Sequence, residues 1–501
     1  MITQSDIVYF LLTDRFFDGD PKNDFDVNRE NSRAYHGGDF KGIIEKIPYL
    51  KNLGVNTVWI TPVYINIHLP QQDSWGYHGY WTLDFEKIDD HLYSPSEGKP
   101  RGTKEYLREL VDTLHRNHMK IILDIVVNHT GYNHPGQRGE LSTKIAPHWF
   151  NPSGKYTEEE MYLYGLPDLD HDQPEVADYF VNNILDWIEA TGVDGIRMDA
   201  VKHIERAFWY YFKNYVRGKY PEVSVIAEVL DMDVDRVSRF QRYFAFDSLF
   251  DFPLQQAIWD VFIHDKSLNL MARPRLHDDE PKGVLDKDTL YTNHNRLIVL
   301  LDNHDVKKRF FSEALDRFGG NREKALKAFK MAVTFLLTTR GIPQIYYGTE
   351  IAMEGYSDPD NRRDMPWKIF DDGLEPSDKY PLEKEAFEHV KKSIALRNRT
   401  PALQYASLLT LYADYFVYAF LREFRGNNVI VAINNGHAPM PSPLTIDVGI
   451  NSNIPPRIKK NLEGTRLFNQ LDPNALPIQV TNGRFEIQLA GKTAAVYTSS
   501  A

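Results

Sequence analysis

The chain has 501 residues and a mass of 58.1 kDa, enough for about three domains or for one large α/β barrel with additions. Hydrophobic residues make up 42% and charged residues 26%, which excludes a disordered, collagenous or coiled-coil chain. Asp and Glu outnumber Lys and Arg by 70 to 58 without a basic block, so we expect no nucleic-acid partner. Cysteine is absent, so any metal must bind to oxygen or imidazole ligands.

The apolar run at residues 7–12 predicts a strand rather than a signal peptide. It is cut off by Asp14 and Arg15, has no basic residues before it, and has no cleavage site of small residues. No apolar stretch approaches the ~18 residues that a membrane span needs, so we expect no membrane partner. As written, the sequence predicts a cytoplasmic protein, monomeric or weakly oligomeric; a secreted protein whose leader was removed stays open.

Short apolar runs alternate with amphipathic helix patterns from the N-terminus to about residue 390. The runs mostly lack polar alternation, which is typical of parallel strands buried on both faces. Eight such runs predict an α/β fold, a (β/α)8 or TIM barrel whose last helix spans 382–398. The expected strands are 7–13, 57–62, 120–127, 195–199, 224–228, 245–250, 297–302 and 342–347.

Two interruptions of this pattern predict further domains. Residues 130–170 are rich in Gly, Pro, His and Tyr and show little periodicity, which indicates an insertion after the third strand. From about Thr400 the pattern changes to short strands with Asn-Gly turn signals. We therefore expect a barrel of residues 1–129 and 171–399, an inserted domain of 130–170, and an antiparallel β-sandwich of 400–501.

Aromatic residues make up 13% of the chain and are not confined to apolar runs. The segment 75–81, Trp-Gly-Tyr-His-Gly-Tyr-Trp, alternates flat apolar faces with polar groups. Any one aromatic residue is more often a core residue than a binding residue. A cluster of this kind, however, suits a sugar ring, which has an apolar C–H face and a rim of hydroxyl groups.

Acidic residues end several of the predicted strands, where the active sites of α/β barrels collect. Arg197 and Asp199 are two residues apart in one strand, so their side chains point the same way. Glu228 follows the apolar run 225–227, which predicts a pKa raised by burial. With Asp305, these groups suggest the paired carboxyls of glycoside cleavage. Taken singly, each acid could also be a helix cap or a member of a structural ion pair.

Five segments carry a resemblance to a known family. Residues 124–129, 195–203, 227–229 and 301–305 resemble the four signature regions of the α-amylase family, the family 13 glycoside hydrolases. A fifth, Leu-Pro-Asp-Leu-Asp at 166–170, resembles the extra motif of that family at the end of its inserted domain B. The resemblance covers the barrel, the insertion and the C-terminal domain C. It lies closest to the α-amylase and cyclodextrin glucanotransferase branch.

The resemblance implies catalytic roles for three carboxylates. Asp199 would be the nucleophile that forms a β-glycosyl-enzyme, and Glu228 the general acid and then the base. Asp305 would bind the sugar hydroxyls as the ring flattens. Double displacement would retain the α-anomer, with the Asp199 and Glu228 carboxyls ~5 to 5.5 Å apart. The substrate-binding residues that the resemblance implies are His78, Tyr80, His129, Tyr164, Arg197, Lys202, His203, His304, Asp358 and Arg362.

The resemblance also implies calcium, which prefers hard oxygen ligands. Asn128, Asp168 and the backbone carbonyl of His203 match the family's site between domain B and the barrel. A second, acidic loop resembles the extra calcium loop of cyclodextrin glucanotransferases, although a solvated acidic loop stays an alternative. Its candidate ligands are Asp18, Asp20, Asn23, Asp24, Gly37 and Asp39.

The subtype is predicted from departures within the family. Tyr164 lies where glucanotransferases place an aromatic residue around which the glucan curls. Those enzymes also usually have an aromatic residue two positions after the acid/base, where this chain has Leu230. The leading prediction is hydrolysis of α-1,4 bonds in an α-glucan substrate. A 4-α-glucanotransferase, a cyclodextrin-forming or cyclodextrin-degrading enzyme, and a non-catalytic sugar-binding protein are the alternatives.

Overall fold

The computed structural model describes residues 1–71, 73–139, 144–154, 157–273 and 283–499. Within these residues, eight parallel strands form a sheet in the order β8-β7-β6-β5-β2-β1-β10-β9. A parallel bridge between Phe250 and Ile298 brings its two ends together, so the predicted barrel is confirmed. The strands are β1 (Val8–Leu11), β2 (Thr57–Ile60), β5 (Lys120–Ile125), β6 (Gly195–Met198), β7 (Ser224–Ala227), β8 (Ser248–Leu249), β9 (Ile298–Leu300) and β10 (Ile342–Tyr346).

The strand β8 is shorter than the sequence predicts. The apolar run begins at Ala245, but this residue ends the preceding helix α7 (Val234–Phe244) in a left-handed conformation with φ of 54°. The strand therefore begins three residues later, at Ser248. An apolar run alone does not distinguish a strand from the end of a buried helix.

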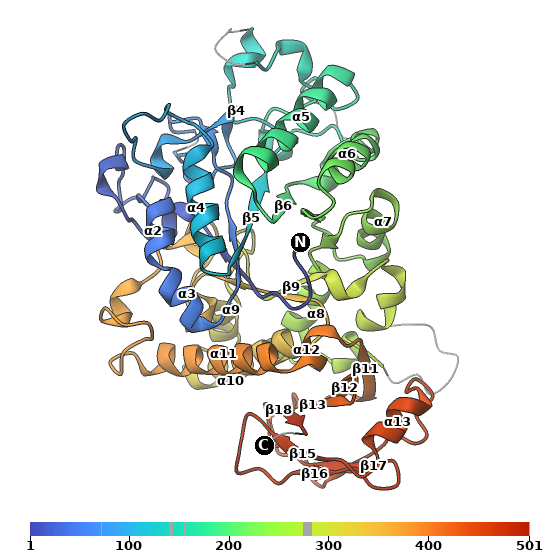
Figure 1. The fold of residues 1–501 in the computed structure, drawn as a ribbon. Coiled ribbons are helices and arrows are strands. Elements are labelled where there is room, and N and C mark those ends of the chain that lie inside the picture. The colour runs from blue at the N-terminus through green and yellow to red at the C-terminus, as the bar shows by residue number, and fades with distance from the viewer. Residues whose placement is uncertain (72, 140–143, 155–156, 274–282, 500–501) are drawn as a thin grey trace.

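Helices cover the outside of the barrel (Figure 1). The amphipathic patterns form helices as expected: Leu107, Leu110 and Leu114 of α4 are buried, as are Phe180 and Trp187 of α5. In the described part of the chain, every helix is too short or too polar to span a bilayer. The helices besides α7 are α1 (Thr13–Phe16), α2 (Phe40–Glu45), α3 (Ile47–Leu53), α4 (Glu105–Arg116), α5 (Pro174–Thr191), α6 (Arg206–Lys219), α8 (Phe252–Phe262), α9 (Phe310–Arg317), α10 (Arg322–Thr338), α11 (Pro381–Arg399), α12 (Pro401–Tyr405) and α13 (Pro456–Leu462).

Two segments extend from the barrel at the carboxyl ends of its strands. The hairpin β3 (Tyr64–Asn66) and β4 (Thr82–Ile88), which the sequence analysis missed, follows β2. The described parts of 130–170 contain the 3-10 helices η3 (Pro135–Arg138), η4 (Pro147–Trp149) and η5 (Leu163–Gly165). Figure 1 shows this segment at the top, opposite the C-terminal sheet. The exact domain boundaries stay predictions.

The C-terminal part is antiparallel, as expected. Among the described residues, one sheet has the order β11-β12-β13-β18-β15-β16, and a second pairs β14 with β17. The helices α12 and α13 depart from the predicted β-sandwich of 400–501. The strands are β11 (Leu408–Ala413), β12 (Val417–Phe424), β13 (Asn427–Asn434), β14 (Leu444–Asp447), β15 (Arg466–Asn469), β16 (Ile478–Gln479), β17 (Arg484–Ile487) and β18 (Thr493–Thr498).

The large C-terminal sheet is buried on both faces. Tyr418 and Phe420 of β12 pack against Phe335 of α10 and belong to the barrel core. The alternate residues Ala419 and Leu421 belong to a second core between the two C-terminal sheets.

Candidate active site

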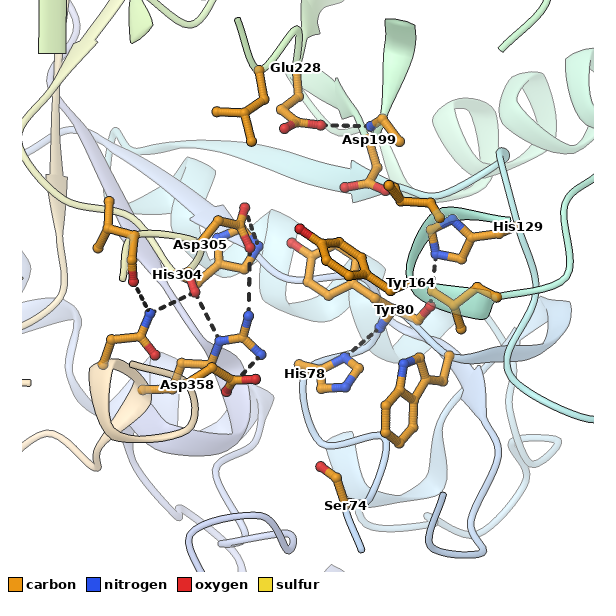
Figure 2. Close-up of a pocket in the computed structure, with 18 of the residues that line it drawn as sticks. Ser74, His78, Tyr80, His129, Tyr164, Asp199, Glu228, His304, Asp305 and Asp358 are labelled. Carbon is orange, nitrogen blue, oxygen red and sulfur yellow. Dashed lines mark hydrogen bonds and ion pairs between the residues drawn. The ribbon is translucent and has the colours of Figure 1, made fainter. Parts of the chain in front are cut away.

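A cavity of about 840 Å³ lies at the carboxyl ends of the barrel strands. Its wall includes side chains that follow β5, β6, β7 and β9, together with side chains from both segments that extend from the barrel. Figure 2 shows Asp199, Glu228 and Asp305 directed into the same space. The predicted site residues that line the cavity are His78, Tyr80, His129, Tyr164, Asp199, Lys202, His203, Glu228, His304, Asp305, Asp358 and Arg362.

Arg197 lies in β6 behind the cavity wall and is 1% exposed. Its Nη1 donates to Asp199 Oδ1 at 2.6 Å and to Asp124 Oδ1 at 2.8 Å. Its Nη2 lies 3.7 Å from Glu228 Oε2. Burial disfavours the charged guanidinium, but Asp124 and Asp199 together hold its pKa well above the ordinary value. One buried cation therefore orients Asp199 and lies close to Glu228.

Asp124, near the end of β5, was not among the predicted site residues. It is fully buried and accepts hydrogen bonds from Arg197, from the Tyr80 hydroxyl at 2.9 Å and from Trp59 Nε1 at 3.2 Å. Burial raises its pKa to about 7, while Arg197 lowers it. The available signal was a carboxylate inside an otherwise apolar strand, since a buried charge needs partners. Asp124 thus supports both Arg197 and Tyr80 from below the cavity.

Glu228 follows β7, whose residues Val225 and Ala227 are buried. Burial raises the pKa of Glu228 to about 7, with Asp199 and Asp305 acting in the same direction against Arg197. This is the shift predicted from the apolar run 225–227. At neutral pH the side chain is therefore divided between the acid and the carboxylate, which suits a group that must first give and then take a proton.

Two histidines and a tyrosine form the next part of the wall. His78 Nδ1 accepts the Tyr80 N–H at 3.1 Å, so a neutral ring carries its proton on Nε2. Burial lowers the pKa of His78 and of His304 well below the usual value. The Tyr80 and His304 rings stack with centroids 5.2 Å apart. These neutral rings offer flat faces and hydrogen-bonding nitrogens to an uncharged ligand.

His129 lies between Tyr80 and Asn128. Its Nε2 donates to the Tyr80 carbonyl at 3.2 Å, and its Nδ1 lies 3.4 Å from Asn128 Nδ2. Burial lowers its pKa, so the ring is neutral. Both ring nitrogens are thus engaged by protein groups, and the ring itself lines the cavity.

Arg362 joins the remaining carboxylates on the side formed after β10. Its Nη2 lies 3.6 Å from Asp305 Oδ1, and its Nη1 lies 3.3 Å from Asp358 Oδ1. Its Nε donates to the His304 carbonyl at 3.0 Å. Asp305 is therefore fixed by a cation other than the one that orients Asp199.

The cavity wall also contains the residues that bear on the enzyme subtype. Tyr164 of η5 is 82% exposed, and its carbonyl accepts from the Tyr132 hydroxyl at 2.9 Å. Leu230, two residues after Glu228, lines the cavity and is 40% exposed. Lys202 and His203 lie in the 3-10 helix η6 (Val201–His203) and also line the cavity. These parts of the wall thus combine exposed apolar side chains with one cation.

The predicted first calcium site contains oxygen atoms without partners. Asn128 Oδ1 and Asp168 Oδ1 are buried and accept no hydrogen bond within the described residues. Residues 129 and 168 form an antiparallel bridge, which brings the two segments together. Burial raises the pKa of Asp168 to about 8, with Glu205 acting in the same direction. Unpartnered buried oxygens of this kind fit a hard cation.

The second predicted site shows a similar pattern. Asp18 Oδ1, Asn23 Oδ1 and Asp24 Oδ1 are buried without a hydrogen-bond partner among the described residues. Burial and the neighbouring Asp18 raise the pKa of Asp24. Gly37 lies so close that a Cβ there would be 2.4 Å from Asp24 Oδ1. This set of oxygens also fits a cation.

The remaining two predicted ligands of that loop serve as helix caps. Asp39 caps α2 by accepting the Gly42 N–H at 2.6 Å, and burial raises its pKa to about 6. Asp20 accepts the Lys22 N–H at 3.3 Å at the start of η1 (Pro21–Asn23).

A further cluster with the composition of a metal site consists of His68, Asp89 and His91, whose candidate ligand atoms lie within 4.8 Å of one another. Asp89 already accepts from His91 Nδ1 at 2.7 Å, from His68 Nε2 at 3.1 Å and from the Asn66 N–H at 2.8 Å. His91 Nε2 lies 3.1 Å from the Phe25 carbonyl. The cluster is satisfied by hydrogen bonds and supports the loop that contains Phe25.

Comparison with known proteins gives the family. The model described as "Alpha amylase, catalytic domain" matches residues 10–150 and 149–406. The chain therefore belongs to the α-amylase family. It is 34% identical over 506 residues to a beta/alpha-amylase of Paenibacillus polymyxa, covering 98% of this chain and 37% of that protein. It is 31% identical to a cyclomaltodextrinase of Thermoanaerobacter pseudethanolicus, covering 86% of this chain and 70% of the relative.

Solved structures of the same family share the fold of this chain. An Anoxybacillus α-amylase matches with a TM-score of 0.80 and 31% identity over 99% of this chain and 98% of its own. An α-amylase from Geobacillus thermoleovorans, solved with acarbose, matches with a TM-score of 0.80 and 30% identity over the full length of both chains. A cyclomaltodextrin glucanotransferase with three domains matches with a TM-score of 0.78 and 29% identity, over 99% of each chain. Hydrolases and transferases of the family thus share this architecture.

Proposed function

We propose that this chain is a retaining glycoside hydrolase that cleaves α-1,4-glucosidic bonds in starch, maltooligosaccharides or related α-glucans. One observation carries the proposal. In a single cavity, Asp199 accepts a 2.6 Å hydrogen bond from Arg197, while Glu228 has a pKa raised to about 7 by burial. Two carboxyl groups in different environments are what acid-assisted attack on a glycoside requires.

In the first step, Asp199 attacks the anomeric carbon while the bond from that carbon to the leaving oxygen breaks. Glu228 gives its proton to the leaving oxygen, which departs as a sugar hydroxyl. Asp305, held by Arg362 at 3.6 Å, supports the hydroxyls of the flattened ring. The product of this step is a glycosyl ester of Asp199 with inverted configuration at the anomeric carbon.

In the second step, Glu228 takes a proton from water, and the water oxygen attacks the same carbon. The ester bond to Asp199 breaks, and its electron pair returns to the carboxylate. Two inversions restore the α-configuration. Asp199 ends as a carboxylate and Glu228 as the protonated acid, the forms in which they began.

A 4-α-glucanotransferase is the second candidate, because a sugar hydroxyl can replace water in the second step. Tyr164 favours it, since an 82% exposed ring at the cavity rim is free to contact a long glucan. Leu230 favours hydrolysis, since it gives an acceptor sugar a smaller apolar surface than an aromatic ring would. A non-catalytic sugar-binding protein is the least supported reading, because all three candidate catalytic carboxylates line the cavity.

We also propose two calcium ions. One would be held by Asn128, Asp168 and the His203 carbonyl, and the other by the loop that contains Asp18 and Asp24. The support is the set of buried oxygens that accept no hydrogen bond from the part of the chain that the structure describes. Calcium at these positions would neutralise buried carboxylates and tie the inserted segment to the barrel.

The test is a time course of products from maltohexaose, with a cyclodextrin assayed in parallel. Shorter linear sugars alone, released as α-anomers, would support the hydrolase. Products longer than the substrate, or cyclic products, would assign the transferase. Binding of maltohexaose without turnover of either substrate would refute both enzymatic assignments.

A further inference from the structure

An ion-pair network crosses the rim of the cavity on the side of Lys202 and Leu230. Glu158, from the inserted segment, is its centre. Its Oε1 lies 3.5 Å from Lys202 Nζ, and Arg236 Nη2 donates to both of its carboxylate oxygens, at 3.0 and 2.9 Å. The backbone carbonyl of Glu158 accepts from His203 Nδ1 at 2.8 Å. One residue thus contacts two residues of the cavity wall.

The network also reaches the segment that follows β7. Arg236 lies in α7 and pairs with Asp231 at 2.9 Å. Asp231 directly follows Leu230, which lines the cavity two residues after Glu228. Through Arg236, Glu158 therefore connects the loop after β6, which carries Lys202, to the loop after β7, which carries Leu230.

We propose that Glu158 is a positioning residue for the acceptor side of the active site. It holds Lys202 and the Leu230 segment in the arrangement that binds the sugar units beyond the cleaved bond. The inference rests on the proposed function, in which Glu228 gives its proton to the leaving group. Leu230 follows Glu228 by two residues and Lys202 follows Asp199 by three, and we place both on the leaving-group side of the cavity. Glu158 itself is not among the residues of the cavity wall, so it acts through its neighbours.

The Glu158 carboxylate matters for binding because it fixes the side chain of Lys202. Its side chain is 20% exposed, and Glu158 is its ion-pair partner in the described chain. A long, flexible cation without a fixed partner loses rotamer freedom when a sugar orders it, which weakens binding. Glu158 orders the amine before the substrate arrives. Among the described residues, the hydrogen bonds and ion pairs of Asp358 and Arg362 do not involve Glu158, Lys202 or Arg236. We therefore expect sugar units on the Asp358 side of the cavity to bind as before.

The experiment compares two substrates in the wild-type chain and in Glu158→Gln. Maltohexaose places sugar units on both sides of the cleaved bond, whereas a nitrophenyl maltotrioside has only its aryl group on the acceptor side. The readout is the ratio of kcat/KM for maltohexaose to kcat/KM for the aryl substrate. We expect this ratio to fall about two- to fivefold, the scale of a partly exposed ion pair. The aryl substrate alone should change less than twofold.

The matched control is Glu159→Gln. Glu159 is the next residue and pairs with Arg206 at 2.8 Å, outside the cavity wall. It should leave the ratio unchanged. A second variant, Arg236→Gln, breaks the link to the β7 side and should lower the ratio in the same direction as Glu158→Gln. Raising the ionic strength to 1 M should lower the wild-type ratio toward that of Glu158→Gln, since salt screens exposed pairs.

The outcomes distinguish failure of the role proposed for Glu158 from failure of the proposed function. An unchanged ratio in Glu158→Gln and Arg236→Gln, or an equal fall in Glu159→Gln, would overturn the role of Glu158. Loss of activity on both substrates to the same extent in Glu158→Gln would indicate a general structural role and would also overturn it. A wild-type chain that cleaves neither substrate would instead refute the proposed function.

Discussion

The backbone N–H of Ala200 donates to Glu228 Oε2 at 2.8 Å, so the residue after Asp199 binds the side chain of Glu228. Ala200 adopts a left-handed conformation with φ of 50°, which turns the chain sharply at the end of β6. Only a substitution of Ala200 by proline would remove this main-chain donor. The positions of the two carboxylates are therefore coupled through the backbone as well as through Arg197.

Glu228→Gln tests the assignment of the general acid. We expect kcat to fall by at least about a hundredfold, because the amide cannot give its proton to the leaving oxygen. The amide can still accept the Ala200 N–H, so folding and maltooligosaccharide binding should be kept. The measurements are kcat, the thermal melting curve and calorimetric binding. Glu222→Gln, at an exposed position, is the control; loss of binding as severe as the loss of turnover would contradict the role.

The pH dependence of kcat/KM should have an alkaline limb near pH 7. The pKa of Glu228 is raised to about 7, chiefly by burial, and the reaction needs its protonated form. Activity should therefore be present below this pH and be lost as the pH rises through it. The measurement is kcat/KM for maltohexaose from pH 4 to 9. An activity that keeps rising through pH 9 would count against Glu228 as the acid.

Asp124→Asn should destabilise the fold and impair catalysis together. Asp124 accepts hydrogen bonds from the buried Arg197, and breaking a buried pair costs about 3 kcal/mol or more. Tyr80 and Arg197 should then shift, which lowers kcat. Urea unfolding gives the free energy, and Asp112→Asn, whose pair with Arg108 is exposed, should change it by less than about 0.5 kcal/mol. Equal stability of the two variants would contradict the buried role of Asp124.

Chelation should lower the melting temperature if calcium fills the proposed sites. A ligand that binds only the folded state at a thousand times its Kd contributes about 4 kcal/mol, which chelation removes. Added calcium should restore the melting temperature. Asp168→Asn should respond less, because the first site has lost a carboxylate. An unchanged melting curve after long incubation in excess chelator would argue against both sites.

Much of the barrel was predictable because parallel strands buried on both faces read as continuous apolar runs. The hairpin β3–β4 was not, since its burial pattern is mixed and neither apolar runs nor alternation mark it. The start of β8 depended on the left-handed Ala245, which no sequence pattern indicates.

The candidate site was predictable where polar residues end strands. Asp199, Glu228 and Asp305 all line the cavity for this reason. Asp124 and Glu158 were missed because their importance lies in partners far away in sequence. Asp124 accepts a hydrogen bond from Arg197, which is 73 residues away in the sequence, and Glu158 accepts one from Arg236, which is 78 residues away.

The C-terminal sheet shares the hydrophobic core of the barrel, so the two cannot be separated without loss of core contacts. Because Tyr418 and Phe420 pack against Phe335 of α10, the barrel core includes part of the sheet. Arg422 of β12 adds a polar bond, since its Nη1 donates to the Thr338 carbonyl at 2.7 Å. Cutting the chain near residue 400 would expose the apolar surface around Phe335 to water and leave the Thr338 carbonyl without its Arg422 donor. Engineers who wish to shuffle catalytic barrels of this kind would have to move the sheet with them.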